Sequence, residues 1–251
     1  VRAFLGAVGI ADHEGRIKPT RRDKYRQIEE FVRLLDPAIR DARAAGALRD
    51  PTPENPWSVV DLGCGHAYLT LAAYVHLSVV RGLPVRVRGI DVRPASRDRN
   101  SALVAVLGWT DDVTFEAATI QDAQVEPAPD IVLALHACDT ATDDALARAV
   151  TWGSAVILAA PCCHHDLQSQ LGRHPAPEPY GLVTRYGLLR ERFVDVLTDA
   201  LRATLLRLVG YRVDAIEFVS DEHTPRNLML RAVRTGAGAA PDDLRQYRDL
   251  T

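Results

Sequence analysis

Short apolar runs and longer amphipathic segments alternate along most of the chain, and this alternation predicts an α/β fold. Runs that are almost continuously apolar are typical of strands buried on both faces of a parallel sheet. Such runs begin at Trp57, Val85, Val113, Asp130 and Ala155, and segments with a helical pattern separate most of them. Two further strands, 213–219 and 227–233, bring the expected sheet to seven mostly parallel strands with helices on both faces.

The first 50 residues are expected to form a helical cap over this sheet. Residues 1–15 carry a weak apolar pattern that suggests a helical arm. From Thr20 to about Ala45 apolar residues recur every three or four positions, which predicts an amphipathic helix with Thr20 as its N-cap. The proline-rich stretch 50–56 ends that helix. The cap is therefore expected at 1–50, the main domain at 57–234 and a mobile C-terminal tail at 235–251.

The connections of the main domain are expected to place polar residues at the ends of strands. Tyr68 to Gly82 is expected to be a helix, and Thr142 is expected to cap the helix after the fourth strand. Residues 173–187 are expected to form a crossover loop that covers a crevice, followed by a long helix over 188–208. In open α/β sheets ligands bind at the carboxyl ends of the strands, so the candidate chemistry should gather there.

The stretch Val59–Thr70 combines the end of a strand, a tight glycine turn and the start of a helix. Glycines at 63 and 65 let the backbone approach a ligand that a Cβ would keep away, and the amides of a helix start can receive a carboxylate. Asp61 precedes the glycines, and the third glycine of the dinucleotide fingerprint is missing. An anion in that place argues against a cofactor that carries a pyrophosphate.

Composition narrows the partners and the cellular compartment expected for the protein. A formal net charge of −3 and a pI near 6.3 argue against a generally basic coat for nucleic acid. Among the four cysteines, Cys162 and Cys163 are adjacent, which is a poor layout for a secreted disulfide framework. No apolar run approaches the roughly 20 residues that cross a bilayer, and the first residues lack a signal-peptide pattern. We expect a cytoplasmic protein without a membrane partner.

The acid-Leu-Gly-Cys-Gly turn resembles motif I of the class I S-adenosylmethionine-dependent methyltransferases, which have a Rossmann-like fold. The resemblance implies S-adenosylmethionine as the cofactor, with Asp61 and the turn facing its methionine amine and carboxylate. Asp91 lies 26 residues beyond Gly65, near the distance at which an acid at the second strand's tip meets ribose hydroxyls.

The same resemblance assigns the remaining cofactor contacts. In this family residues after the third strand bracket the adenine, so Ile120 is expected against the ring and Asp122 at the exocyclic amine. An N-terminal helix closes over the cofactor in many members, which brings in Lys24, with Tyr25 or Gln27 as alternatives. The cofactor residues expected in this way are Lys24, Asp61, Gly63, Cys64, Gly65, Tyr68, Asp91, Val92, Ile120, Gln121, Asp122 and Leu135.

Polar and sulfur-bearing residues follow the fourth and fifth strands, and three kinds of chemistry are open to them. In a methyl-acceptor site, Asp139 or His136 would remove the proton of a hydroxyl or nitrogen. A zinc site would use the cysteines, but their spacing lacks Cys-x-x-Cys, so no metal is expected. A cysteine nucleophile at Pro161-Cys162 would resemble the enzymes that methylate pyrimidine carbon. The candidate catalytic residues are His136, Asp139, Cys162, Cys163 and His164, with a structural role at the strand ends as the alternative for the histidines and cysteines.

These two strand ends also resemble a narrower group of methyltransferases. The signatures His136-x-Cys138-Asp139-x-Ala141-Thr142-Asp143 and Cys162-Cys163-His164 are similar to the domain shared by tRNA acceptor-stem 2′-O-methyltransferases and several methyltransferase-like proteins. In that group the tip reads His-x-Cys-Gly-x-Ala-Thr-Asp, and Asp139 replaces the glycine here. The resemblance spans about residues 20–233 and does not include the cysteine/histidine zinc modules of the RNA enzymes.

A cluster of basic residues at the start of the N-terminal helix is a candidate RNA-binding surface, with a solvated helix face as the alternative. Its members are Arg16, Lys18, Arg21, Arg22, Lys24 and Arg26, opposed only by Asp23. The sequence thus predicts methyl transfer from S-adenosylmethionine to an oxygen or nitrogen, with an RNA 2′-hydroxyl as the leading acceptor. A small molecule or a protein is the alternative acceptor, and a non-catalytic scaffold that binds RNA or a protein is the contrasting function.

Overall fold

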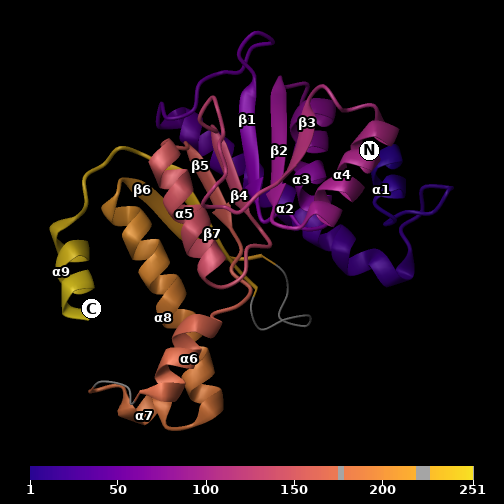
Figure 1. The fold of residues 1–251 in the computed structure, drawn as a ribbon. Coiled ribbons are helices and arrows are strands. Elements are labelled where there is room, and N and C mark those ends of the chain that lie inside the picture. Colours follow the sequence, from indigo (N-terminus) through magenta and orange to yellow (C-terminus); the bar gives the residue numbers. More distant parts are fainter. Residues whose placement is uncertain (175–177, 219–226, 251) are drawn as a thin grey trace.

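The computed structural model describes residues 1–174, 178–218 and 227–250, and within them the chain forms a seven-stranded sheet covered by helices on both faces (Figure 1). The strand order is β3-β2-β1-β4-β5-β7-β6. The first five strands pair in parallel, whereas β7 runs antiparallel to β5 and β6. The predicted Rossmann-like, mostly parallel sheet is therefore confirmed. The strands are β1 Trp57–Leu62, β2 Val85–Asp91, β3 Val113–Ala117, β4 Ile131–Ala134, β5 Val156–Ala159, β6 Tyr211–Glu217 and β7 Leu228–Arg234.

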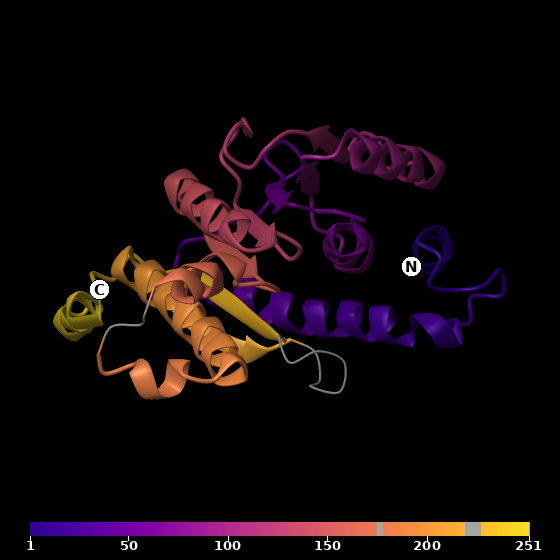
Figure 2. The ribbon, with the colours of Figure 1, turned by 60° about the horizontal axis from the view of Figure 1, so that its bottom comes forward.

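The helices pack on the two faces of the sheet in separate groups. On one face lie α2, α3 and α4, and on the other lie α5 and α8 (Figure 2). The short α1 lies against α4, and α6 and α7 project beyond the sheet at the bottom of Figure 1. The helices are α1 Arg2–Ala7, α2 Arg22–Ala44, α3 Tyr68–Tyr74, α4 Pro94–Leu107, α5 Thr140–Trp152, α6 His165–Arg173, α7 Gly181–Thr184, α8 Gly187–Leu208 and α9 Pro241–Leu250.

Neighbouring residues of a central strand point to opposite faces and so belong to different hydrophobic cores. On β1, Val59 packs in the core that includes α2 and α3, while Val60 packs in the core that includes α5 and α8. Both are almost fully buried, as the continuous apolar run predicted. Phe31 and Leu35 of α2 are also fully buried in the first core, so the N-terminal helix is an integral part of the domain.

The N-terminal cap is present, but its long helix starts later than predicted. A 3-10 turn over Pro19–Arg21 (η1) comes first, and α2 begins at Arg22. Thr20 lies inside that turn and Arg21 occupies the N-cap position, so the prediction of Thr20 as the N-cap is wrong. Pro19 accounts for the difference, because its fixed φ favours the first residue of a helical turn and it begins η1 there.

Two further helix predictions need correction. The helix expected over residues 68–82 is α-helical only to Tyr74, and a π-helical turn over Val75–Val80 (η2) continues it. Thr142 is not the cap of α5, because the helix already begins at Thr140. The buried hydroxyl of Thr142 instead donates a hydrogen bond of 2.6 Å to the carbonyl oxygen of Ala137.

The C-terminal third contains more helix than the sequence predicted. The expected crossover loop 173–187 includes the helical turn α7, and its residues 175–177 lie outside the described residues. The connection 220–226 and Val219, the end of a predicted strand, also lie outside them. In the expected tail, α9 contacts α8 through an ion pair of 2.9 Å between Arg207 and Asp243. None of the helices in the described residues combines the length and the apolar character that crossing a membrane requires.

Candidate active site

The turn after β1 brings the backbone close to the loop after β4. Gly63 has a φ of +75°, and a Cβ built on it would lie 3.2 Å from the Cα of Ala137. A larger residue there would therefore be strained both by its conformation and by its neighbour. Gly65, with a φ of +54°, is held from both sides. Its N–H donates to Asp91 at 2.9 Å, and its carbonyl accepts from the buried Asn100 of α4 at 3.0 Å.

Asp61 is a buried acid near the end of β1, just before this turn. Thr70 donates a hydrogen bond to one of its carboxylate oxygens, while the other oxygen, Oδ1, has no hydrogen-bond partner among the described residues. Burial raises the pKa of Asp61 from 3.8 to about 7, with the hydrogen bond from Thr70 opposing the shift and the charge of Asp91 adding to it. Such an oxygen is suited to a cationic partner, because an ammonium group would both satisfy and neutralise it.

Asp91, at the end of β2, is occupied by protein groups on both of its oxygens. Arg93 approaches it with its backbone N–H at 3.0 Å and its Nε at 2.9 Å, and Gly65 donates to the second oxygen. Burial raises the pKa of Asp91, but these hydrogen bonds lower it more strongly, so its net pKa lies below the usual value. Because the Arg93 side chain is 63% exposed, it can leave the carboxylate to other hydrogen-bond donors.

A cavity of about 570 Å³ lies at the carboxyl ends of β1, β2 and β4. It brings together five of the predicted cofactor residues with two residues of the β4 end: Gly63, Asp91, Val92, Ile120, Gln121, His136 and Cys138. Several other residues line the cavity although the sequence did not predict them, namely Ile90, Arg93, Ala118, Thr119, Ala137, Ala141 and Asp144. Asp144 holds Gln121 by a hydrogen bond of 3.1 Å, a contact between the loop after β3 and α5 that no local pattern signals.

A second cavity, of about 360 Å³, borders the other end of the glycine turn. Tyr68 and Lys24 line it, and the Lys24 ammonium lies 5.2 Å from the centre of the Tyr68 ring. The Tyr68 hydroxyl donates a hydrogen bond to Gln27 of α2. Burial raises the pKa of Tyr68 to about 12, so the hydroxyl stays protonated at neutral pH. The N-terminal helix thus reaches Tyr68 at the end of the glycine turn, and its contact with a cofactor stays a prediction.

Five of the predicted cofactor residues line neither cavity, namely Asp61 and Gly65 of the turn region together with Cys64, Asp122 and Leu135. Leu135 and Cys64 are almost fully buried, and Leu135 packs within the hydrophobic core. Asp122 lies in a local turn, where its carboxylate accepts a hydrogen bond of 2.7 Å from the hydroxyl of Thr119. Contact of these five residues with a cofactor stays a prediction.

Comparisons with known proteins identify the domain. A family model described as "Methyltransferase domain" matches residues 23–170, which is more than half of the chain. The chain belongs to this methyltransferase family. A probable chloroplastic tocopherol O-methyltransferase of Oryza sativa subsp. japonica is 28% identical over 171 residues. That match covers 64% of this chain and only 40% of the rice protein.

One solved structure of low sequence identity shares the fold of this methyltransferase domain. An SAH-bound methyltransferase of Podospora anserina has a TM-score of 0.51 at 13% identity, over 93% of this chain and 88% of that one. Magnesium protoporphyrin IX methyltransferase of Synechocystis PCC 6803, solved with bound SAH, has a TM-score of 0.45 at 16% identity, over 92% of each chain. The predicted class I, S-adenosylmethionine-dependent methyltransferase domain is confirmed at the level of the family.

His136, which follows β4 in this methyltransferase domain, lines the first cavity. Its ring centre lies 5.6 Å from that of Tyr68, so it also borders the glycine turn. Part of the side chain is open to solvent. Desolvation of the rest, followed by the positive charges of His66 and Lys24, lowers the pKa of His136 below 6.5. The imidazole is therefore mainly neutral at pH 7 and able to accept a proton.

Asp139 adopts a backbone conformation that explains the glycine found at its position in the narrower family pattern. Its φ is +57° with a ψ of −128°, a region that residues with a Cβ rarely occupy. Its carboxylate accepts the backbone N–H of Asp166 at 3.0 Å, and its carbonyl accepts a hydrogen bond of 2.9 Å from Arg202. The buried Arg202 also binds both carboxylate oxygens of Asp143. Through these hydrogen bonds Asp139 connects the segment after β4 with the segment after β5 and with α8.

His164 and the cysteines at these strand ends occupy different environments. His164 is buried and lies between two carboxylates of α8, with its Nε2 2.9 Å from Asp199 and its Nδ1 3.1 Å from Asp195. It does not line the first cavity, and its predicted catalytic role stays a prediction. Cys138 and Cys162, in contrast, are exposed, and their sulfur atoms lie 3.1 Å apart. Burial and the neighbouring thiols raise the pKa of Cys162.

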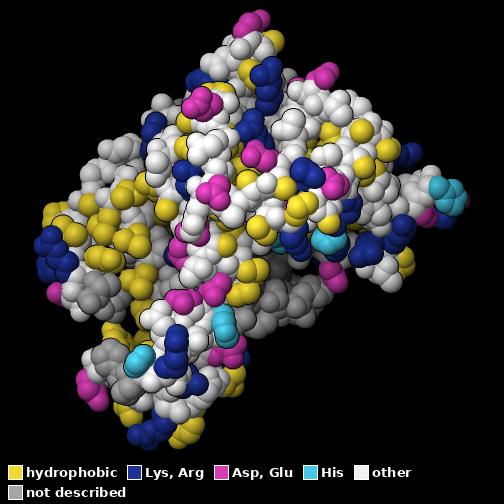
Figure 3. Space-filling model, in the orientation of Figure 1, with side chains coloured by type: hydrophobic (Ala, Val, Ile, Leu, Met, Phe, Trp, Pro, Cys, Tyr) yellow, Lys and Arg dark blue, Asp and Glu magenta, His cyan; other side chains and the backbone are white. Residues whose placement is uncertain are grey.

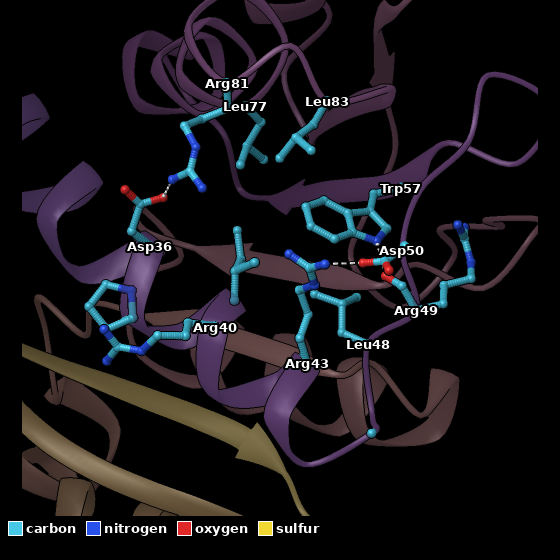
Figure 4. Close-up of a pocket in the computed structure, with 13 residues that line it drawn as sticks. Asp36, Arg40, Arg43, Leu48, Arg49, Asp50, Trp57, Leu77, Arg81 and Leu83 are labelled. Carbon is cyan, nitrogen blue, oxygen red and sulfur yellow. Dashed lines mark hydrogen bonds and ion pairs between the residues drawn. The ribbon is translucent and has the colours of Figure 1, made fainter.

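The cavity of about 880 Å³ in Figure 4 lies at the opposite edge of the sheet, beside Trp57 at the start of β1. It is lined by several arginines, but acids neutralise part of this charge. Arg81 lies 2.9 Å from Asp36, and Arg43 pairs with Asp50 (Figure 4). Ligands of open α/β sheets bind at the carboxyl ends of the strands, so this cavity is a poor candidate for the methyl-transfer site.

The predicted basic cluster lies on the N-terminal segment, and the Lys and Arg side chains around that segment are visible on the right of Figure 3. Five of its members are exposed, namely Arg16, Lys18, Arg21, Arg22 and Arg26. Arg16 is exposed but paired with Asp12 at 3.0 Å, and Lys24 lies over the Tyr68 ring. Contact with RNA stays a prediction.

Proposed function

We propose that the protein transfers a methyl group from S-adenosylmethionine to an acceptor that binds at the carboxyl ends of β4 and β5. One observation carries this proposal. The 570 Å³ cavity is lined by Gly63 of the glycine turn, by Asp91 at the end of β2, and by the polar residues His136 and Cys138 after β4. Its volume falls within the range of about 300–1,000 Å³ that small-molecule sites have.

Residues in and near the turn are suited to the methionine ammonium, the ribose and the base of this cofactor. The Asp61 oxygen that has no hydrogen-bond partner among the described residues favours a methionine ammonium. Gly63 lies so close to Ala137 that the turn has no space for a side chain there. Asp91 is placed to accept the ribose hydroxyls once the Arg93 side chain moves aside. Ile120 supplies an apolar surface for the base.

S-adenosylmethionine supplies an electrophilic methyl group on its sulfonium. The chain must then hold the acceptor atom close and in line, and it must remove a proton if a hydroxyl or protonated nitrogen attacks. His136 is better placed for this role than Asp139. Its imidazole lines the cavity and its pKa is lowered, whereas an Asp139 oxygen is engaged by the backbone of Asp166.

An oxygen acceptor on a small molecule is the substrate class that we propose first. The volume of the cavity supports it, and so does the name of the rice relative, a tocopherol O-methyltransferase. An RNA 2′-hydroxyl is the second candidate, and the exposed basic residues at and just before the start of α2 favour it. Both acceptors need the same base, so they differ only in what binds outside the cavity.

Label transfer separates these possibilities. Purified protein is incubated with methyl-tritiated S-adenosylmethionine and a cell extract, which is then split into RNA, protein and small-molecule fractions. Label in the small-molecule fraction supports the first proposal, and label in RNA supports the second. His136→Gln should lose most of the transfer while retaining cofactor binding, and His13→Gln, at a histidine that is 87% exposed, is the matched control. Cofactor binding without label in any fraction would instead support a non-catalytic scaffold.

A further inference from the structure

Three cysteine thiols converge beside the cofactor cavity, although they come from two separate strand ends. Cys138 follows β4, and Cys162 and Cys163 follow β5. Because β4 and β5 are paired in parallel, their carboxyl ends lie side by side. The sulfur of Cys162 lies 3.1 Å from that of Cys138 and 3.7 Å from that of Cys163, and all three lie within 4.8 Å of one another.

These distances are close to those of a thiolate-bound zinc ion. Zinc–sulfur bonds of about 2.3 Å in a tetrahedron place two sulfurs roughly 3.8 Å apart. The Cys162–Cys163 separation already has this value, and the Cys138–Cys162 separation needs to open by roughly 0.7 Å. Two of the three side chains are exposed, so an ion can reach them from solution.

The composition of the group points to a thiophilic divalent metal. Soft thiolate ligands select zinc over magnesium or calcium, which prefer oxygen ligands. Within the described residues no histidine, carboxylate or fourth cysteine completes the group. Three protein ligands with an open fourth position are the arrangement of catalytic zinc sites, whereas structural zinc sites have four. Cys138 also lines the cofactor cavity, so this open position adjoins it.

We propose that Cys138, Cys162 and Cys163 bind one Zn²⁺ ion, whose fourth coordination position is filled by water or by the acceptor beside the cofactor cavity. Each thiol loses its proton as it coordinates, so binding releases up to three protons per ion. The sequence expectation of no metal relied on the missing Cys-x-x-Cys spacing. That spacing applies to ligands of one loop, and here the parallel pairing of β4 and β5 replaces it.

Metal binding is measured on the full chain, reduced and freed of metal, without reference to methyl transfer. Titration with Zn²⁺ against a chromophoric chelator should give one tightly bound ion per chain. Co²⁺ should give the thiolate-to-metal charge-transfer band and the intense visible bands of a tetrahedral site. Cys138→Ser, Cys162→Ser and Cys163→Ser should each weaken Zn²⁺ binding roughly 100-fold or more. Cys64→Ala, at a buried cysteine outside the group, should leave the stoichiometry at one.

A second measurement needs no variant and therefore does not depend on how the substitutions fold. Zn²⁺ should protect Cys138, Cys162 and Cys163 of the native protein from alkylation, as read by mass spectrometry of each cysteine. Failure of the reduced protein to take up Zn²⁺ would overturn the proposal, as would alkylation that Zn²⁺ does not slow. A Cys138–Cys162 disulfide that forms in air, with no metal uptake after reduction, would assign the pair a redox role instead. None of these outcomes bears on whether the cofactor binds.

Discussion

The free energy of unfolding of Asp61→Asn, taken relative to that of the wild type, should be greater at pH 8 than at pH 5. The carboxylate is buried, and only Thr70 donates to it among the described residues. Its pKa is about 7 in the folded protein against 3.8 when exposed, so the folded state holds the proton more tightly between these values. Stability from this group is therefore greatest at low pH and is lost as the pH rises from about 4 to about 7.

The magnitude follows from the size of the shift. One pKa unit corresponds to about 1.4 kcal/mol, so the whole shift corresponds to roughly 4 kcal/mol. Most of the loss falls between pH 5 and pH 7. The free energy of unfolding of the wild type should thus fall by roughly 2–3 kcal/mol between pH 5 and pH 8 relative to Asp61→Asn, whose amide does not titrate.

Urea denaturation at pH 5, 6, 7 and 8 measures this difference, because titrations common to both proteins cancel. Asp111→Asn, at an exposed carboxylate, is the matched control and should give a difference that does not depend on pH. A difference between wild type and Asp61→Asn that is constant across this range would refute a raised pKa for Asp61. Binding of S-adenosylhomocysteine should also release a proton near pH 7 in the wild type alone, because its ammonium favours the charged carboxylate.

Three further predictions concern the two acids at the strand ends and the basic cluster. Asp91→Ala should weaken S-adenosylhomocysteine binding by roughly 1–3 kcal/mol in calorimetry, and an unchanged affinity would remove Asp91 from the site. Arg93→Ala should tighten the same binding up to about five-fold, because it frees the Asp91 carboxylate. Asp139→Gly should be more stable than Asp139→Ala by about 1–3 kcal/mol in urea denaturation, since only glycine relieves the φ of +57°, and equal stabilities would argue against that strain. Neutralising Arg21, Arg22 and Lys24 should flatten the salt dependence of RNA binding, and an RNA affinity that ignores salt in the wild type would argue against phosphate contacts.

Local patterns predicted the sheet and the turn because burial leaves a direct record in the sequence. Strands such as β5 are buried on both faces and are therefore continuously apolar. The turn at Gly63 and Gly65 needs residues without a Cβ, so it is recognisable from a few positions. Resemblance to a family then extended this to Asp91 and Ile120, which the structure places in one cavity.

The missed features depend on contacts between distant segments. The ion pair of Arg93 with Asp91 and the hydrogen bond of Asp144 with Gln121 follow from how the loops fold, and a count of residue spacings does not show them. The convergence of the cysteines depends on the register of β4 against β5. The unusual φ of Asp139 did leave a trace, because the similar family has glycine there, but a carboxylate in that place was interpreted as a candidate base.

The most direct test is a crystal structure of the protein with S-adenosylhomocysteine. The account predicts the ligand in the 570 Å³ cavity, with its ribose hydroxyls on Asp91, its ammonium near Asp61 and the Arg93 side chain displaced. A ligand bound elsewhere, or an Arg93 side chain still paired with Asp91 at saturating ligand, would contradict this prediction.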